Sequence, residues 1–214
     1  AKEKDDLPHP KTFSLRLGLT ACPWPYLHAP TGETFYAAAD ALDNCTIYEL
    51  GMIFMLFERY ILQNDISIAD TLLATIYRPG KPDTEELRRA GFHNDRRLPL
   101  LDHESTVQQR IPYFQQLPHL SKQLLLFWVA SCRQNIVDQF PNVFRTQSAE
   151  VERTGNDYAW AGVLLNLAGG LPGLPTVQQQ NWYNALTYLS MLEDQRKEQE
   201  RKAAKQKRMQ RSRR

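Results

Sequence analysis

The chain has 214 residues, of which 42% are hydrophobic, 23% charged and 10% aromatic, and its formal net charge is +2. This is a globular composition, which excludes disordered and fibrous classes, and the length is enough to bury the core of one domain or two small ones. The most apolar run, residues 51–57, is far shorter than the roughly 18 residues of a membrane span, so we expect no contact with a membrane.

The N-terminus and the cysteines predict a cytoplasmic protein. Residues 1–6 carry both signs of charge and no apolar stretch follows them, so we expect no secretory signal. The three cysteines, Cys22, Cys45 and Cys132, lie far apart in the sequence. An odd, unclustered set argues against a disulfide scaffold and against a metal site made of cysteine alone.

The first 32 residues are expected to form a proline-rich, irregular arm. They contain five prolines, which lack a backbone donor and break helices. Alternating side chains at residues 13–17 permit a short strand. Residues 22–26 combine prolines with aromatic residues and are interpreted as an extended strap packed on the body.

Residues 33–144 are predicted to form a helical core domain. Helical spacing begins near Glu33, where it is carried by Phe35, Ala38, Ala39 and Leu42. Thr46 and Glu49 have the form of a capping box, which predicts that a helix begins after Thr46. That helix is apolar nearly all round, so we expect it at the centre of the fold. Its main face comprises Ile47, Leu50, Phe54, Phe57 and Ile61.

The rest of the core domain is predicted to contain three more helices. Ser67 and Asp70 suggest a second capping box and a helix over residues 68–77, before Pro79. Residues 90–102 show no periodicity and are expected to form a loop. A modest helix is predicted over 103–111, broken by Pro112, and a strong one over 121–140. The apolar face of the strong helix comprises Leu124, Leu125, Phe127, Trp128, Ile136, Val137 and Phe140.

The C-terminal part is predicted to be a helical hairpin on a hinge. The hinge is the polar stretch 145–157, and the hairpin covers 158–192. Its first helix spans 158–168, glycines and prolines at 169–175 force a turn, and Thr176 caps the final helix.

Residues 193–214 are predicted to continue that final helix as a projecting, charged segment with a basic tail. Glu193–Lys197 and Glu198–Lys202 have the i,i+4 spacing that stabilises an isolated helix. Residues 201–214, called the basic segment, hold eight Lys or Arg and no acid, so the other 200 residues carry a formal charge of −6. The candidate partner-binding residues are Arg201, Lys202, Lys205, Lys207, Arg208, Arg211, Arg213 and Arg214. The alternative is a solubilising, frayed helix end.

No catalytic or cofactor site is predicted. No two histidines have the i,i+4 spacing of a helical metal pair, and the run Asp102-His103-Glu104 is better explained as a helix N-terminus. Cys132 lies in an apolar helix and is interpreted as a buried hydrophobic residue. The glycines at 169–173 lack the phosphate-loop pattern. Arg78 either binds the last carbonyls of its helix or anchors a neighbouring acid.

Several hydrophobic stretches resemble proteins of phage and prophage tail modules. They are TLLATIYRP (71–79), LLFWVASCR (125–133), QFPNVF (139–144), YAWAGVLLNLA (158–168) and NALTYL (184–189). The last two are similar to the short helical proteins that tail gene clusters place near the tape-measure gene, which are regarded as tail assembly chaperones or minor tail components. The resemblance extends over residues 40–190 and implies no catalytic residue.

Together these observations predict an all-α or nearly all-α bundle with a proline-rich arm and a projecting charged helix. The expected function is non-enzymatic: phage-tail assembly or a structural role in the tail, through contacts with tape-measure or tube proteins. The host cytoplasm is the expected location, with the virion as the other one. The alternative is a small nucleic-acid-binding protein that uses the basic segment.

Overall fold

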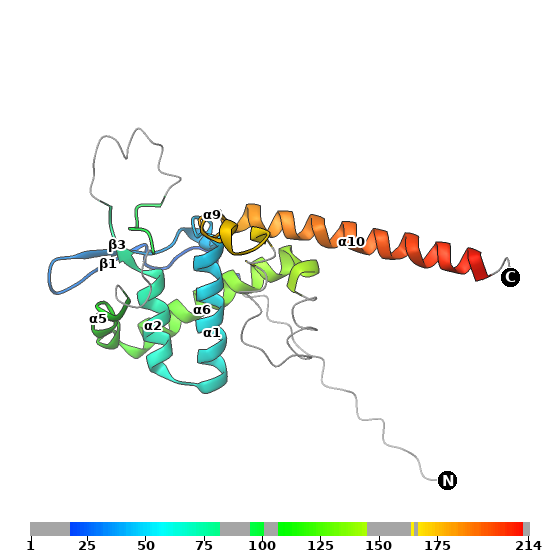
Figure 1. The fold of residues 1–214 in the computed structure, drawn as a ribbon. Helices are drawn as coiled ribbons and strands as arrows, with labels where there is room; N and C mark the ends of the chain where they lie inside the picture. Colours follow the sequence, from blue (N-terminus) through cyan, green and yellow to red (C-terminus); the bar gives the residue numbers. More distant parts are fainter. Residues whose placement is uncertain (1–17, 82–94, 101–106, 145–163, 165–166, 212–214) are drawn as a thin grey trace, which may run out of the picture.

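The computed structural model describes residues 18–81, 95–100, 107–144, 164 and 167–211 (Figure 1). Within these ranges the chain is mostly helical, but it also contains a small three-stranded sheet, so the fold is not strictly all-α. The elements in chain order are β1 (Tyr26–His28), β2 (Thr34–Tyr36), the 3-10 turn η1 (Asp40–Leu42), α1 (Ile47–Gln63), α2 (Ile66–Ile76), β3 (Arg78–Pro79), α5 (Ile111–Gln115), α6 (His119–Gln139), the 3-10 turn η2 (Leu171–Gly173), α9 (Leu174–Gln178) and α10 (Trp182–Arg211).

Helix α1 is the central helix, as predicted. The hydroxyl of Thr46 accepts a hydrogen bond from the Glu49 amide (3.2 Å), and the Glu49 carboxylate accepts one from the Thr46 amide (3.2 Å), which confirms the capping box. Leu50 and Phe54 are almost completely buried. Ile61, which was predicted on the same face, is 61% exposed because the last turn of α1 extends past its neighbours to the α1–α2 corner.

The N-terminal strap and the sheet cover one end of the α1–α2 pair. The indole of Trp128 donates to the Thr20 carbonyl (3.0 Å), and the Tyr77 hydroxyl donates to the Trp24 carbonyl (2.7 Å), so the predicted packing of residues 22–26 on the body is confirmed. Strand β1 follows directly and pairs antiparallel with β2, which pairs antiparallel with β3. The predicted strand at 13–17 lies outside the described residues.

The predicted helix beginning near Glu33 is wrong. Phe35 is buried in strand β2, opposite Leu27 and Pro79, and only η1 is helical in this segment. Ala41 and Leu42 have positive φ angles (55° and 63°), which a right-handed helix does not permit. The spacing of the apolar residues alone did not distinguish a helix from a strand here, because the same apolar residues are buried in either conformation.

Two predicted helix boundaries are also corrected. Helix α2 is capped by Asp65, whose carboxylate accepts from the Ser67 amide (2.9 Å), while Asp70 is buried against Lys122 (2.6 Å) and caps nothing. Pro112 does not break a helix. It lies in the first turn of α5, where a backbone N–H would have no hydrogen-bond acceptor within the helix, so the N–H that proline lacks is not needed. Of the predicted helix 103–111, residues 103–106 lie outside the described residues.

Helix α6 forms near the predicted bounds and crosses α1 and α2 (Figure 1). Leu125, Trp128 and Ile136 are fully buried against them. Leu124 and Phe127, which were predicted on the buried face, are 40% and 41% exposed. Phe127 lies about 160° around the helix from Leu125, whereas Leu124 lies at the edge of the buried face, about 40° from Trp128. The polar hinge 145–157 and most of the predicted helix 158–168 lie outside the described residues.

The C-terminal helix begins later than predicted. Thr176 lies inside the short helix α9, and α10 begins at Trp182, with Asn181 accepting a hydrogen bond from the Tyr183 amide (2.9 Å). Gly169 and Gly170 have positive φ angles in the turn before α9. Helix α10 is continuous to Arg211 and projects from the body, as predicted (Figure 1).

Candidate partner-binding surface

The base of α10 is anchored in the core by its first two turns. Trp182 is 2% exposed, its indole donates to the Leu42 carbonyl (2.8 Å), and its ring meets Phe140 edge-on. Leu186 is fully buried one turn later. Farther along, Asn142 connects the end of α6 to Asp194 (3.1 Å) and to Lys197 (3.0 Å). These contacts hold α10 at a defined angle to the body.

Beyond Lys197 the helix is supported mainly by its own side chains. Arg196 pairs with Glu193 (2.9 Å) and Glu200 (3.0 Å), and Lys202 pairs with Glu198 (2.6 Å). The Glu198–Lys202 pair confirms one prediction. The predicted Glu193–Lys197 pair is absent from the described contacts, because Glu193 pairs with Arg196 and Lys197 reaches Asn142 instead.

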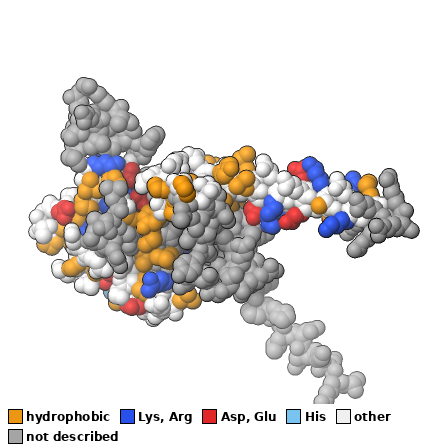
Figure 2. Space-filling model, in the orientation of Figure 1, with side chains coloured by type: hydrophobic (Ala, Val, Ile, Leu, Met, Phe, Trp, Pro, Cys, Tyr) orange, Lys and Arg blue, Asp and Glu red, His pale blue; other side chains and the backbone are white. Residues whose placement is uncertain are grey.

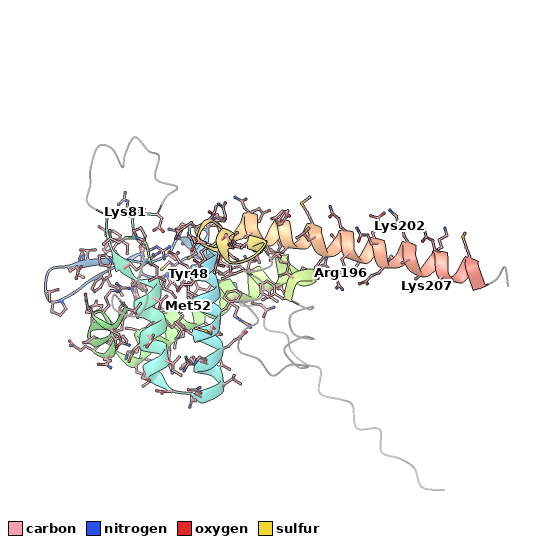
Figure 3. All side chains as sticks on the ribbon, in the orientation of Figure 1. Tyr48, Met52, Lys81, Arg196, Lys202 and Lys207 are labelled. Atoms are coloured by element: carbon pink, nitrogen blue, oxygen red, sulfur yellow. The ribbon has the colours of Figure 1, made fainter. Side chains whose placement is uncertain are left out.

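The structure places most of the candidate basic residues on the exposed end of α10. Arg201, Lys202, Lys205 and Lys207 are exposed, and no acid follows Glu200 in the sequence. Figure 3 shows Lys202 and Lys207 on the projecting part of the helix. Arg208 and Arg211 belong to the same helix. Arg213 and Arg214 lie outside the described residues. A projecting helix with cations on several sides favours acidic ligands.

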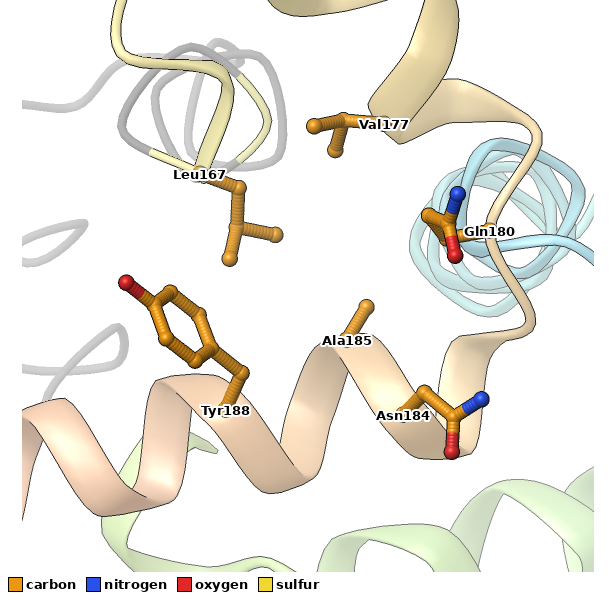
Figure 4. Close-up of a pocket in the computed structure, with 6 residues that line it drawn as sticks. All are labelled: Leu167, Val177, Gln180, Asn184, Ala185 and Tyr188. Carbon is orange, nitrogen blue, oxygen red and sulfur yellow. The ribbon is translucent and has the colours of Figure 1, made fainter.

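A small apolar surface lies where α10 leaves the body. We call the exposed side chains of Tyr188 (53%), Met191 (57%) and Leu192 (39%) the apolar base of α10; Figure 2 shows apolar side chains gathered here, with charged ones farther along. Next to it is an open pocket of about 210 Å³, the α9–α10 pocket (Figure 4). Its lining is Leu167, Val177, Gln180, Asn184, Ala185 and Tyr188.

The α9–α10 pocket was not foreseen from the sequence. The single helix predicted after Thr176 would contain both Val177 and Ala185, but the turn between α9 and α10 puts them on two helices that face each other (Figure 4). The carboxamides of Gln180 and Asn184 provide donors and acceptors beside the apolar lining. Such a pocket suits an apolar side chain presented by a partner helix.

A buried ionic network, also missed at the sequence level, lies between α1, β3 and residues 95–97. Arg78 contacts Glu49 (2.7 Å) and Asp95 (3.6 Å), and Arg97 contacts the same two acids (3.4 and 2.8 Å). Arg78 therefore anchors neighbouring acids, one of the two roles considered for it. The other role belongs to Arg97, which donates to the Ile76 carbonyl at the end of α2 (3.1 Å). Two acids balance two bases, so the network needs no external ion.

The cysteines are buried or half-buried, and the two described histidines contact neighbouring polar side chains. Burial raises the pKa of the Cys45 and Cys132 thiols to about 12, and it also raises the pKa of Cys22, so the reactive thiolates are scarce at neutral pH. His28 contacts Thr34, and His119 contacts Gln123. Among the described residues there is no group of three potential metal ligands. The run 102–104 lies outside them.

No helix within the described ranges is long and apolar enough to cross a membrane. No protein-family model matches the chain, and comparisons with curated proteins and with solved structures found no match.

Proposed function

We propose that the chain is a non-enzymatic protein of phage-tail assembly that holds a helical segment of another tail protein, such as the tape-measure or tube protein. The observation that carries the proposal is the combination of an apolar pocket with a projecting charged helix. The α9–α10 pocket would take an apolar side chain of the partner, and the basic segment would attract acidic residues farther along it. The hydrophobic stretches that resemble tail-module proteins supply the biological setting.

The scarcity of cysteine thiolates supports a non-enzymatic role, because a cysteine nucleophile must ionise to react. The proposal places the protein in the host cytoplasm during assembly, and its presence in the finished virion is a separate question that purified particles would answer.

The test is co-purification of this chain with the tail proteins that neighbouring genes encode, expressed in the same cells. Tyr188→Glu places a charge at the α9–α10 pocket and should abolish capture of the partner. Tyr26→Glu is the matched control, because Tyr26 is also 53% exposed but lies on β1. If no tail protein is enriched by the unaltered chain, or if both variants lose the same partner, the proposal fails.

Nucleic-acid binding by the basic segment is the second candidate function. It is favoured by the exposed basic side chains of Arg201, Lys202, Lys205 and Lys207, because the sequence has no acidic residue from position 201 onward. Binding through phosphates must weaken steeply as salt rises, because each contact releases a counterion. A salt series with a short DNA duplex and a single-stranded RNA separates this function from binding of an apolar helix, which salt changes little.

A further inference from the structure

One face of α10 carries a regular seam along its exposed length. Spacings of four and three residues alternate along it, which is the pattern of positions a and d in a coiled coil. The seam is formed by Tyr188, Leu192, Gln195, Gln199, Lys202, Gln206 and Met209. All seven side chains are exposed. Its centre is polar but nearly uncharged: it has three glutamines, one lysine and no acid.

The α10 seam faces away from the body. Each residue of an α-helix turns by about 100°, so Gln195 lies about 160° around the axis from Glu193. Glu193 and Lys197 are half-buried on the body side of α10, whereas Gln195 and Gln199 are exposed. A second helix could therefore lie along the seam without displacing the anchoring contacts of Trp182 and Asn142.

The charges of α10 are separated along its axis. All its acids lie in residues 193–200, and its charged residues from 201 onward are all basic. A parallel helix pair would set the basic segment of one copy beside that of the other. An antiparallel pair would set each basic segment beside the acids of the opposite copy. We infer that α10 pairs antiparallel with α10 of a second copy of this chain, along the α10 seam.

The seam favours a particular register. When Leu192 faces Met209 of the second copy, Gln195 faces Gln206 and Gln199 faces Lys202, which matches position a to position d in each layer. Beside the seam, Glu198 then faces Lys205 of the second copy. The two-fold symmetry of such a pair repeats each contact, so two Glu198–Lys205 ion pairs form.

The observed side-chain positions are compatible with this pairing. Glu198 and Lys202 pair within one helix, but their side chains are 64% and 71% exposed. Replacing Lys202 by Lys205 of the second copy as the partner of Glu198 therefore costs little free energy. Arg201 and Lys207 lie at positions c and b, away from the second helix, and stay available to acidic ligands. The inference is independent of the proposed function in phage tails, because it concerns the purified chain alone.

The test is sedimentation velocity on the full chain over a range of protein concentrations at low salt. The wild-type chain should show a monomer–dimer equilibrium, since a polar seam gives a weak pair. Glu198→Lys and Lys205→Glu should each weaken the dimer about tenfold, because both symmetry-related ion pairs become repulsive. An equimolar mixture of the two variants should associate as tightly as wild type, since each provides the charge that the other lacks.

The matched controls are Glu200→Lys and Lys207→Glu, which make the same charge changes at position b, away from the seam. Glu200 also resembles Glu198 in having an i,i+4 partner, Arg196. Circular dichroism should show the same helix content in all four variants. The inference is overturned if wild type stays monomeric at every concentration, if the mixture associates no better than either variant alone, or if the controls weaken the dimer equally.

Discussion

Arg78 and Glu49 are in contact at 2.7 Å although their side chains are only 2% and 8% exposed. One comes from β3 and the other from the first turn of α1, so their ion pair ties the sheet to the central helix. The same carboxylate also closes the α1 capping box and contacts Arg97. A single acid thus connects helix initiation, the sheet and the segment at residues 95–97.

Glu49→Gln should destabilise the fold by about 3 kcal/mol, because two buried guanidinium groups would keep only Asp95 as an acidic partner. Urea denaturation at neutral pH measures the change. Glu58→Gln is the control, since Glu58 pairs with Arg133 at the surface and is 53% exposed; it should change stability by less than about 1 kcal/mol. Equal effects of the two variants would mean that the buried network adds nothing.

Thr46→Ala should cost about 1 kcal/mol, because the Glu49 amide loses its acceptor at the start of α1. Thr46→Ser keeps the hydroxyl and should retain most of that stability. The free energies of unfolding of the two variants and the wild type are compared through their urea denaturation midpoints, provided that the denaturant slopes are equal. A neutral Thr46→Ala variant would show that water replaces the hydroxyl without loss.

Deletion of residues 201–214 should leave the melting temperature within about 2 °C of wild type, measured in dilute solution. The deletion removes eight positive charges and takes the formal net charge from +2 to −6. The described side chains of the basic segment are all exposed, so they contribute nothing to the core. Association with an acidic partner should slow instead, because charge steering acts on encounter. A large drop in melting temperature would mean that the basic segment is docked on the body.

The thiols of Cys45 and Cys132 predict a loss of stability in alkali. Their pKa in the folded chain is about 12, against an ordinary value of 9.0, so unfolding releases protons above pH 9. Their contribution is intact below pH 9 and falls by about 1.4 kcal/mol per pH unit for each thiol as the pH rises toward 12.

Urea denaturation at pH 8 and pH 10 measures this loss for wild type and for a Cys45→Ala, Cys132→Ala double variant. The variant should be less stable at pH 8 but should lose less stability on going to pH 10. Parallel pH profiles would show that other groups, such as tyrosines, cause the whole effect.

Local patterns were sufficient for the helices that carry their own start signals and an unbroken apolar face. The box at Thr46 and Glu49 and the run around Trp128 predicted α1 and α6 closely, because a cap and a periodic face involve residues only three or four apart. The charge pairs after Glu193 predicted a helix able to project without a core. The basic segment could also be identified from the sequence, because it depends on local composition alone.

Long-range contacts decided the rest. Phe35 joined a strand instead of a helix because β1 and β3 offered it partners 8 and 44 residues away. Asp70 became half of a buried ion pair because α6 brought Lys122 to it, and Glu49 gained Arg78 and Arg97 in the same way. The α9–α10 pocket required a turn between two helices that the spacing had joined into one. A buried contact with a distant residue stabilises the fold more than local conformational preference does. Only the tertiary structure determines which distant residues meet.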